Sequence, residues 1–257
     1  MKSIIITVIS AIVLSTTAAL GQNAHFTNSG TIEFEKTVNM FALIKKEINK
    51  DNESFLEPAF ETYKKNQPQF KKLKSTLTFG DGKTKFVPGE PEESRGFFGD
   101  NAMVSQNNTV FTDLDSHTFI NQKVVFEETF LVKDSTRKIN WKITDETREI
   151  AGYTCRRANA IIMDSIYVVA FYTDKIHVSG GPEGFTGLPG MILGVALPHE
   201  NITWFATKVQ VVDIPTATIH AETKGKKIDR KSFLDALYKV MKNWDTWGRK
   251  MLLVTQI

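Results

Sequence analysis

Residues 170–197 read AFYTDKIHVSGGPEGFTGLPGMILGVAL. Within this stretch, a loop dense in glycine and proline (179–190) separates a β-like run from a second apolar run (191–197). Glycine adopts backbone angles that other residues avoid, and proline fixes φ and removes a donor, so the loop must have a specific shape between two strands. Phe185 and Leu188 lie inside it. Because both are apolar, we expect the loop to fold back on the core as a structural plug.

The second half of this loop, Gly187-Leu188-Pro189-Gly190, offers no side-chain donor, base or nucleophile. We therefore expect it to shape the fold rather than to catalyse a reaction. Gly190 is predicted to take a backbone angle open mainly to glycine, and Leu188 is predicted to pack on the core with Phe185. The motif of the whole loop consists of Gly181, Pro182, Phe185, Gly187, Leu188, Pro189, Gly190, Met191 and Ile192.

Residues 187–192 read GLPGMI, which resembles the signature of the GLPGLI family, with Met191 in the place of the second leucine. The resemblance extends over 138–209 and includes the segment EIAGYTCRRA at 149–158. His177 departs from the family, which tends to have proline at that position. The family consists of exported bacterial envelope proteins without an established activity. The resemblance therefore implies a compartment and a related fold, but no catalytic residues.

Short β-like runs separated by turn residues predict a mainly β (α+β) fold, a curved antiparallel β-sheet meander. Gly80-Asp81-Gly82 and residues 198–201 have the composition of hairpin turns. A helical insertion near the N-terminus is predicted within 51–73, and a C-terminal amphipathic helix is predicted to begin after Asp229 as its N-cap. Strands are predicted over 30–45, 74–79, 83–87, 102–113, 118–133, 137–143, 149–164, 165–178, 191–197 and 202–212, with a turn at Asp145-Glu146.

The first 21 residues have the features of a secretory signal peptide. Lys2 supplies the positive charge, 4–14 are apolar, and Ala19-Leu20-Gly21 fits a cleavage site. Gln22 rather than cysteine follows the cut, so we expect no lipid anchor. The remainder, 22–257, is predicted to form a single antiparallel β-rich domain without an integral membrane span. We expect it to be soluble and to lie in the periplasm or at the outer membrane.

The composition and the absence of known motifs limit the classes of function that the sequence indicates. A formal net charge of +3 on 257 residues does not indicate a nucleic-acid partner. The sequence has no HExxH, GxSxG, CxxC or phosphate-binding glycine loop, and its histidines lack metal-ligand spacing. We therefore expect neither a cofactor nor a metal.

Three residues are candidates for chemistry. Asp174 and His177 lie close together at the end of a strand, and a histidine near a carboxylate can serve as base or ligand. Cys155 is followed by Arg156, and an arginine facing a thiol lowers its pKa. In an extended strand, however, Arg156 points to the opposite face, and Tyr153 shares the face of Cys155. We therefore expect a buried, unreactive thiol.

A curved sheet is expected to present a concave apolar surface, which is a common form of binding site. We expect a non-enzymatic envelope protein with a binding or chaperone-like role on that surface. Its expected partner is an outer-membrane protein, a peptide or a lipid-like ligand. One alternative is a periplasmic enzyme, such as a hydrolase, that uses Asp174 and His177. The other is an accessory subunit of an outer-membrane complex.

Overall fold

The computed structural model describes residues 28–90, 98, 104, 108–125, 127–243, 248, 252 and 254–256. The predicted signal peptide and the start of the strand predicted over 102–113 lie outside these residues. The described chain contains a 12-stranded sheet with the order β12-β6-β5-β4-β3-β2-β1-β11-β10-β9-β8-β7. Neighbouring strands run antiparallel, except that β12 runs parallel to β6. The mainly β, antiparallel fold predicted from the sequence is confirmed.

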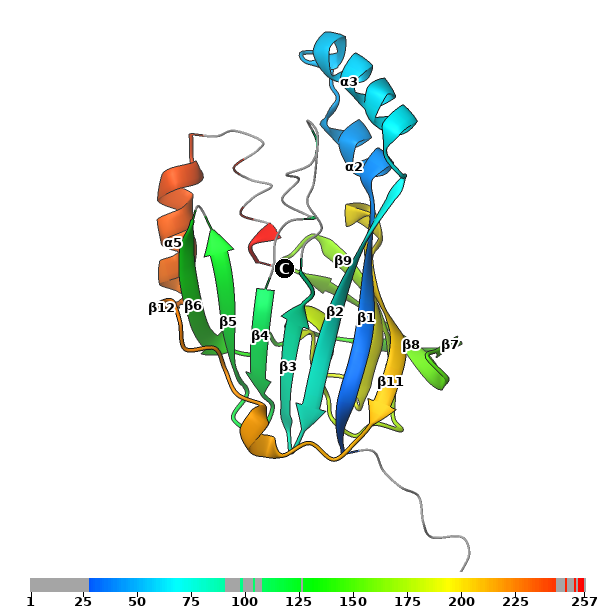
Figure 1. The fold of residues 1–257 in the computed structure, drawn as a ribbon, viewed down its shortest axis with the longest axis vertical. Coiled ribbons are helices and arrows are strands. Elements are labelled where there is room, and N and C mark those ends of the chain that lie inside the picture. The colour runs from blue at the N-terminus through cyan, green and yellow to red at the C-terminus, as the bar shows by residue number, and fades with distance from the viewer. Residues whose placement is uncertain are drawn as a thin grey trace, which may run out of the picture.

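The sheet is joined by helices at two places (Figure 1). Helices α2 (Met40–Glu47) and α3 (Glu53–Asn66) lie beyond one end of β1 and β2, while α5 (Arg230–Met241) packs beside β6 and β12. No helix among the described residues is long and apolar enough to cross a membrane. The strands are β1 (Ser29–Asn39), β2 (Phe70–Gly80), β3 (Lys83–Pro88), β4 (Asn108–Asp113), β5 (Thr118–Val125), β6 (Glu128–Ser135), β7 (Lys142–Ile150), β8 (Tyr153–Ile162), β9 (Ile166–Thr173), β10 (Met191–Leu197), β11 (Ile202–Val211) and β12 (Lys226–Asp229).

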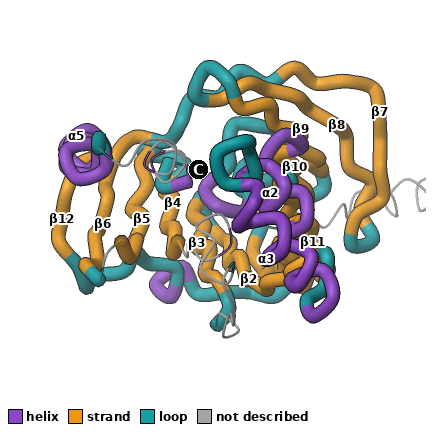
Figure 2. Tube along the Cα trace, turned by 90° about the horizontal axis from the view of Figure 1, so that it is seen from above, coloured by secondary structure: helices purple, strands orange, loops and turns teal. Residues whose placement is uncertain are grey.

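The sheet is strongly curved, as expected. Seen from above, β12 and β6 to β2 form one side of the sheet. The sheet then turns, so that β9, β8 and β7 form its other side, at the upper right of the view (Figure 2). A continuous cluster of buried apolar side chains joins the two halves, with Phe86 and Val110 on one and Val168 and Ile192 on the other. The core therefore lies on the concave side of the sheet.

The turn between β2 and β3 shows how local sequence sets the register. Asp81 and Gly82 have φ of 44° and 69°, the left-handed pair that a two-residue hairpin turn requires. Gly80 consequently pairs with Lys83, and the two strands continue in register to Ser75 and Pro88. The predicted hairpin at Gly80-Asp81-Gly82 is confirmed.

The strand predicted over 30–45 is too long. It ends at Asn39, whose side-chain oxygen accepts a hydrogen bond from the backbone N–H of Ala42 at 3.1 Å. This is an N-cap, which satisfies one of the free donors at a helix start. The apolar residues that follow, Leu43 and Ile44 among them, are therefore buried from a helix and not from a strand.

Several further predictions are wrong in detail. Residues 137–141 lie outside any strand, and the strand predicted over 149–164 contains the turn at Ala151 and Gly152 between β7 and β8. The strand predicted over 118–133 is a hairpin of β5 and β6, with Glu127 at φ 69° in the turn. The turn predicted at Asp145-Glu146 lies within β7, where the register shifts between Ile143 and Thr147. Polar composition alone indicated a turn there, but an exposed strand has the same composition.

Helix α5 begins where the sequence predicted. Asp229 Oδ1 accepts from the backbone N–H of Ser232 at 2.9 Å, which caps the helix. Phe233, Leu237 and Met241 are buried, and the ring of Phe233 lies 5.2 Å from that of Phe130 on β6. This contact places the first turn of α5 beside the concave side of the sheet.

The loop between β9 and β10 folds back on the core, as expected. Phe185 and Leu188 are each only 2% exposed and belong to the main apolar cluster. Gly190 has φ of 141°, and a Cβ on it would lie 2.1 Å from the carbonyl oxygen of Thr173. The Trp141 indole donates to the Thr186 carbonyl at 2.9 Å. The loop thus fills much of the space inside the curved sheet.

Candidate functional site

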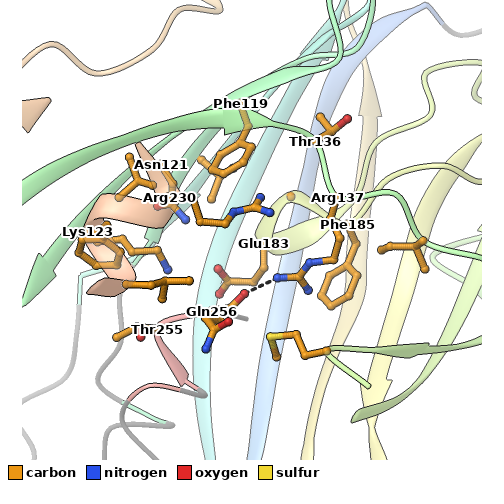
Figure 3. Close-up of a pocket in the computed structure, with 17 residues that line it drawn as sticks. Phe119, Asn121, Lys123, Thr136, Arg137, Glu183, Phe185, Arg230, Thr255 and Gln256 are labelled. Carbon is orange, nitrogen blue, oxygen red and sulfur yellow. Dashed lines mark hydrogen bonds between the residues drawn. The ribbon is translucent and has the colours of Figure 1, made fainter. Parts of the chain in front are cut away.

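A cavity of about 140 Å³ remains beside this loop (Figure 3). It lies between the inward face of β4 to β6, the Gly/Pro loop, the start of α5 and residues 255–256. Its lining mixes charged, amide and apolar groups and is more polar than the surface expected from the sequence. The residues that line it are Val110, Phe119, Asn121, Lys123, Val132, Thr136, Arg137, Ile139, Met163, Glu183, Gly184, Phe185, Arg230, Phe233, Leu234, Thr255 and Gln256.

The backbone of the loop aims a carboxylate into this cavity. Glu183 lies in the short 3-10 turn η2 (Pro182–Gly184) with φ of 51° and ψ of 23°. Left-handed backbone costs about 1–2 kcal/mol at a residue other than glycine. Strain of this kind persists where the surrounding structure enforces it, and it is concentrated at functional sites. Here Gly181 packs closely on Ile192, where a Cβ would come within 2.8 Å of the Ile192 Cβ.

Glu183 is linked to a buried lysine through an asparagine. Asn108 Nδ2 donates to Glu183 Oε2 at 3.0 Å, and Lys123 Nζ donates to Asn108 Oδ1 at 3.0 Å. Asn108 and Lys123 are 4% and 5% exposed. Burial lowers the pKa of Lys123 to about 8, which Glu183 opposes and the nearby cations reinforce. The three side chains form a polar chain from β5 through β4 to the loop.

Two arginines add positive charge to the same cavity. A terminal nitrogen of Arg137 donates to the backbone carbonyl of Gln256, and Figure 3 shows both beside Glu183. Burial lowers the pKa of Arg137 to about 10, and the charge of Arg230 reinforces the effect. The Arg230 guanidinium lies 5.0 Å from the centre of the Phe119 ring. The described lining therefore contains three cations and one carboxylate.

The cavity also contains an unused polar group. Asn121 is 7% exposed, and its side-chain oxygen has no hydrogen-bond partner among the described residues. An unpaired buried acceptor destabilises a fold by about 1–3 kcal/mol. The aromatic side chains of Phe119 and Phe185 flank the cavity. The site thus combines apolar ring faces with amide and charged groups that can make hydrogen bonds.

A smaller cavity of about 20 Å³ lies on the other side of Glu183, which lines both. Lys36 lines it, 9% exposed, with its ammonium 5.2 Å from the centre of the Trp204 ring. Burial lowers the pKa of Lys36, and Glu183 opposes this. Ser75 Oγ and Trp204 Nε1 also lie here, without hydrogen-bond partners in the described part of the chain. Glu183 is therefore the shared counter-charge of two buried lysines.

The candidates chosen from the sequence lie elsewhere. Asp174 and His177 are exposed after β9 and do not line either cavity, and Asp174 faces Lys175 at 4.0 Å. Cys155 is fully buried, as the strand alternation predicted. Burial raises the pKa of its thiol to about 12, and Glu149 reinforces this. The raised pKa disfavours the thiolate near neutral pH.

Sequence reasoning missed the residues that meet in the cavity, namely Asn108, Asn121, Lys123, Arg137, Glu183 and Arg230. One signal could have found two of them. In β5, Asn121, Lys123 and Val125 alternate with more exposed residues and so face inward together. A lysine and an asparagine at inward positions of a strand indicate a buried polar site.

The fold and cavity define a curved β-sheet domain with a cation-rich interior site. By sequence, the chain belongs to the family described as "N-glycanase peptide, N-terminal domain", which matches residues 94–235, more than half of the chain. No curated protein matches it.

Solved structures with a similar fold include two of PNGF-II. One, in space group P21, has a TM-score of 0.51 and 16% identity, and it covers 82% of this chain and 34% of its own. The other, in space group C2, has a TM-score of 0.53 and 13% identity, with 82% and 33% covered. The chain thus spans about a third of the length of PNGF-II, and at this identity the likeness shows the fold alone.

Proposed function

We propose that this chain is a binding domain of the bacterial cell envelope that holds one sugar unit of a protein-linked glycan in the 140 Å³ cavity. Family membership supports a glycan as the ligand, because the family is described by its relation to an N-glycanase. The signal-like N-terminus and the resemblance to the GLPGLI family support the proposed export and envelope location. A peptide is one of the three partners expected from the sequence, and the proposed ligand is a peptide that carries a glycan.

The unpartnered side-chain oxygen of Asn121, in a cavity that two aromatic rings also line, is the observation that carries this proposal. A sugar has apolar C–H faces, which pack on aromatic rings, and hydroxyls, which bond to amides and charged groups. Phe119 and Phe185 supply the rings, and Asn121 and Glu183 supply hydrogen-bonding groups. A cavity of roughly 150 Å³ takes up a benzene ring, so this one suits a single six-membered ring.

The number of carboxylates in the site favours binding over hydrolysis of a glycosidic bond. Enzymes that hydrolyse glycosidic bonds generally use a pair of carboxylates that flank the bond. Within the described lining, Glu183 is the sole carboxylate. It is engaged by Asn108 and lies close to two lysines, an arrangement suited to holding a ligand.

Calorimetric titration with an N-glycopeptide, and with the same peptide without its glycan, tests the proposal. We expect only the glycopeptide to bind. Asn121→Leu should weaken binding by about tenfold or more, the loss of a buried hydrogen bond, while leaving the urea midpoint unchanged or higher. His177→Ala is the control outside the cavity and should bind as the wild type does. Equal binding of both peptides, or wild-type affinity in Asn121→Leu, would contradict the proposal.

A further inference from the structure

The charges of the cavity are not balanced within the described chain. Lys36 and Lys123 share Glu183, and Arg230 has Asp134 at 3.8 Å on its outer side. Arg137 has a different partner, the neutral backbone carbonyl of Gln256. Buried cations are normally paired with carboxylates, because desolvation of an unpaired charge is costly. Arg137 is therefore a half-buried guanidinium whose described hydrogen-bond partner carries no charge.

We infer that the sugar taken by this cavity is acidic, with its oxyanion substituent held by the guanidinium of Arg137 and supported by Lys123 and Arg230. This inference rests on the proposed function and specifies its ligand class. A guanidinium presents its N–H donors in a planar fork that fits the two oxygens of a carboxylate or a sulfate. All three cations line one cavity, and Figure 3 shows them around Glu183.

The positions of the neighbouring groups fit such a ligand. Glu183 is hydrogen-bonded to Asn108, and Arg137 and Gln256 lie beside it, so the oxyanion would bind the Arg137 guanidinium in place of the Gln256 carbonyl. A carboxylate outcompetes a backbone carbonyl for a guanidinium, because charge-assisted hydrogen bonds are roughly twice as strong as neutral ones. The hydroxyls of the sugar remain free to bond Asn121 and Glu183.

The test compares one N-glycopeptide in three forms, with a terminal sialic acid, with that sugar removed, and with a sulfated terminal sugar. We expect the sialylated or the sulfated form to bind about tenfold or more tightly than the neutral form, the gain from one charge-assisted hydrogen-bonded pair. The two acidic arms identify whether a carboxylate or a sulfate is the preferred oxyanion. Arg137→Gln should remove the preference, so that the acidic and the neutral forms bind this variant with affinities within about twofold of each other, since glutamine carries no charge.

Lys138→Gln is the matched control, because Lys138 is the exposed cation next in sequence and does not line the cavity. It should keep the full preference. Equal affinity for all three forms would overturn the acidic-sugar inference and leave the glycan-binding proposal intact. Absence of binding by every form would overturn both. A preference that survives in Arg137→Gln would overturn the role of Arg137.

Discussion

The side-chain amide of Asn108 donates to Glu183 Oε2 at 3.0 Å, although 75 residues separate the two in the chain. This bond ties β4 to the strained turn of the Gly/Pro loop, across the interior of the curved sheet. It also fixes the carboxylate relative to Lys123. The site therefore depends on a contact between two distant segments.

A double-mutant cycle measures this contact. We expect Asn108→Ala and Glu183→Ala to show a coupling free energy of about 1–3 kcal/mol in urea unfolding, because each removes the part-buried hydrogen bond that the other group makes. Additive effects of the two substitutions would show that the bond does not hold the loop.

Gly190 tests the role of the loop in the fold. Gly190→Ala should destabilise the protein by about 3 kcal/mol or more, because its Cβ would collide with the Thr173 carbonyl and its backbone angle is unfavourable for alanine. Gly152→Ala is the control, since Gly152 has φ of 84° but nothing within 4 Å of the added Cβ. It should cost only the backbone strain, about 1 kcal/mol. Similar urea midpoints for the two variants would argue against the close packing of the loop.

Cys155 should not react with a thiol reagent in the folded state. Its pKa is raised to about 12 by burial, so the nucleophilic thiolate is not populated at pH 8, and the side chain is fully buried. Labelling at pH 8 should be slow in buffer and fast in denaturing urea. Rapid labelling in buffer would mean that β8 opens readily or that the thiol is accessible.

The affinity for an acidic ligand should depend on pH through Lys123. The pKa of Lys123 is about 8, so the ammonium that attracts the ligand is present below pH 8 and is lost as the pH rises above it. Affinity should fall by up to about tenfold per pH unit above 8, the limit for one linked proton. The groups that act on Lys123 are Glu183, which favours the charged form, and Arg137, Arg230 and Lys36, which disfavour it.

Lys123→Met should bind more weakly at pH 7 and with little dependence on pH between 7 and 9.5. Fluorescence or calorimetric titrations over this range provide the measurement. A constant wild-type affinity from pH 7 to 9.5 would show that Lys123 does not contact the ligand.

Much of the fold could be predicted from local sequence, because its signals act over a few residues. The hairpin at Asp81-Gly82 could be predicted because aspartate and glycine accept the positive φ of a two-residue turn. Helix α5 could be predicted from the Asp229 cap and an apolar stripe. The burial of Leu188 and the positive φ of Gly190 could both be predicted from the composition of one loop. Strand partners did not follow, since β1 pairs with β11 over a long sequence separation, for example Gly30 with Val211. The parallel strand β12 is only four residues long and has no pattern of its own.

The site was less predictable for the same reason. Asn108, Lys123 and Glu183 come from three separate segments, and only the curvature of the sheet brings them together. Asp174 and His177 were candidates because they are close in sequence. Both follow the end of β9 and are exposed, so proximity in sequence did not indicate a site. The inward alternation of Asn121 and Lys123 was the one local sign of a buried polar site.

Amide hydrogen exchange with and without a saturating sialylated N-glycopeptide tests the central claim most directly, because it locates the bound glycan. The account predicts slower exchange in the segments 119–123, 136–139 and 183–185, each of which contributes residues to the cavity lining, and no such change with the glycan-free peptide. Unchanged exchange at these segments, or protection confined to residues 174–177, would contradict the claim that the cavity is the binding site.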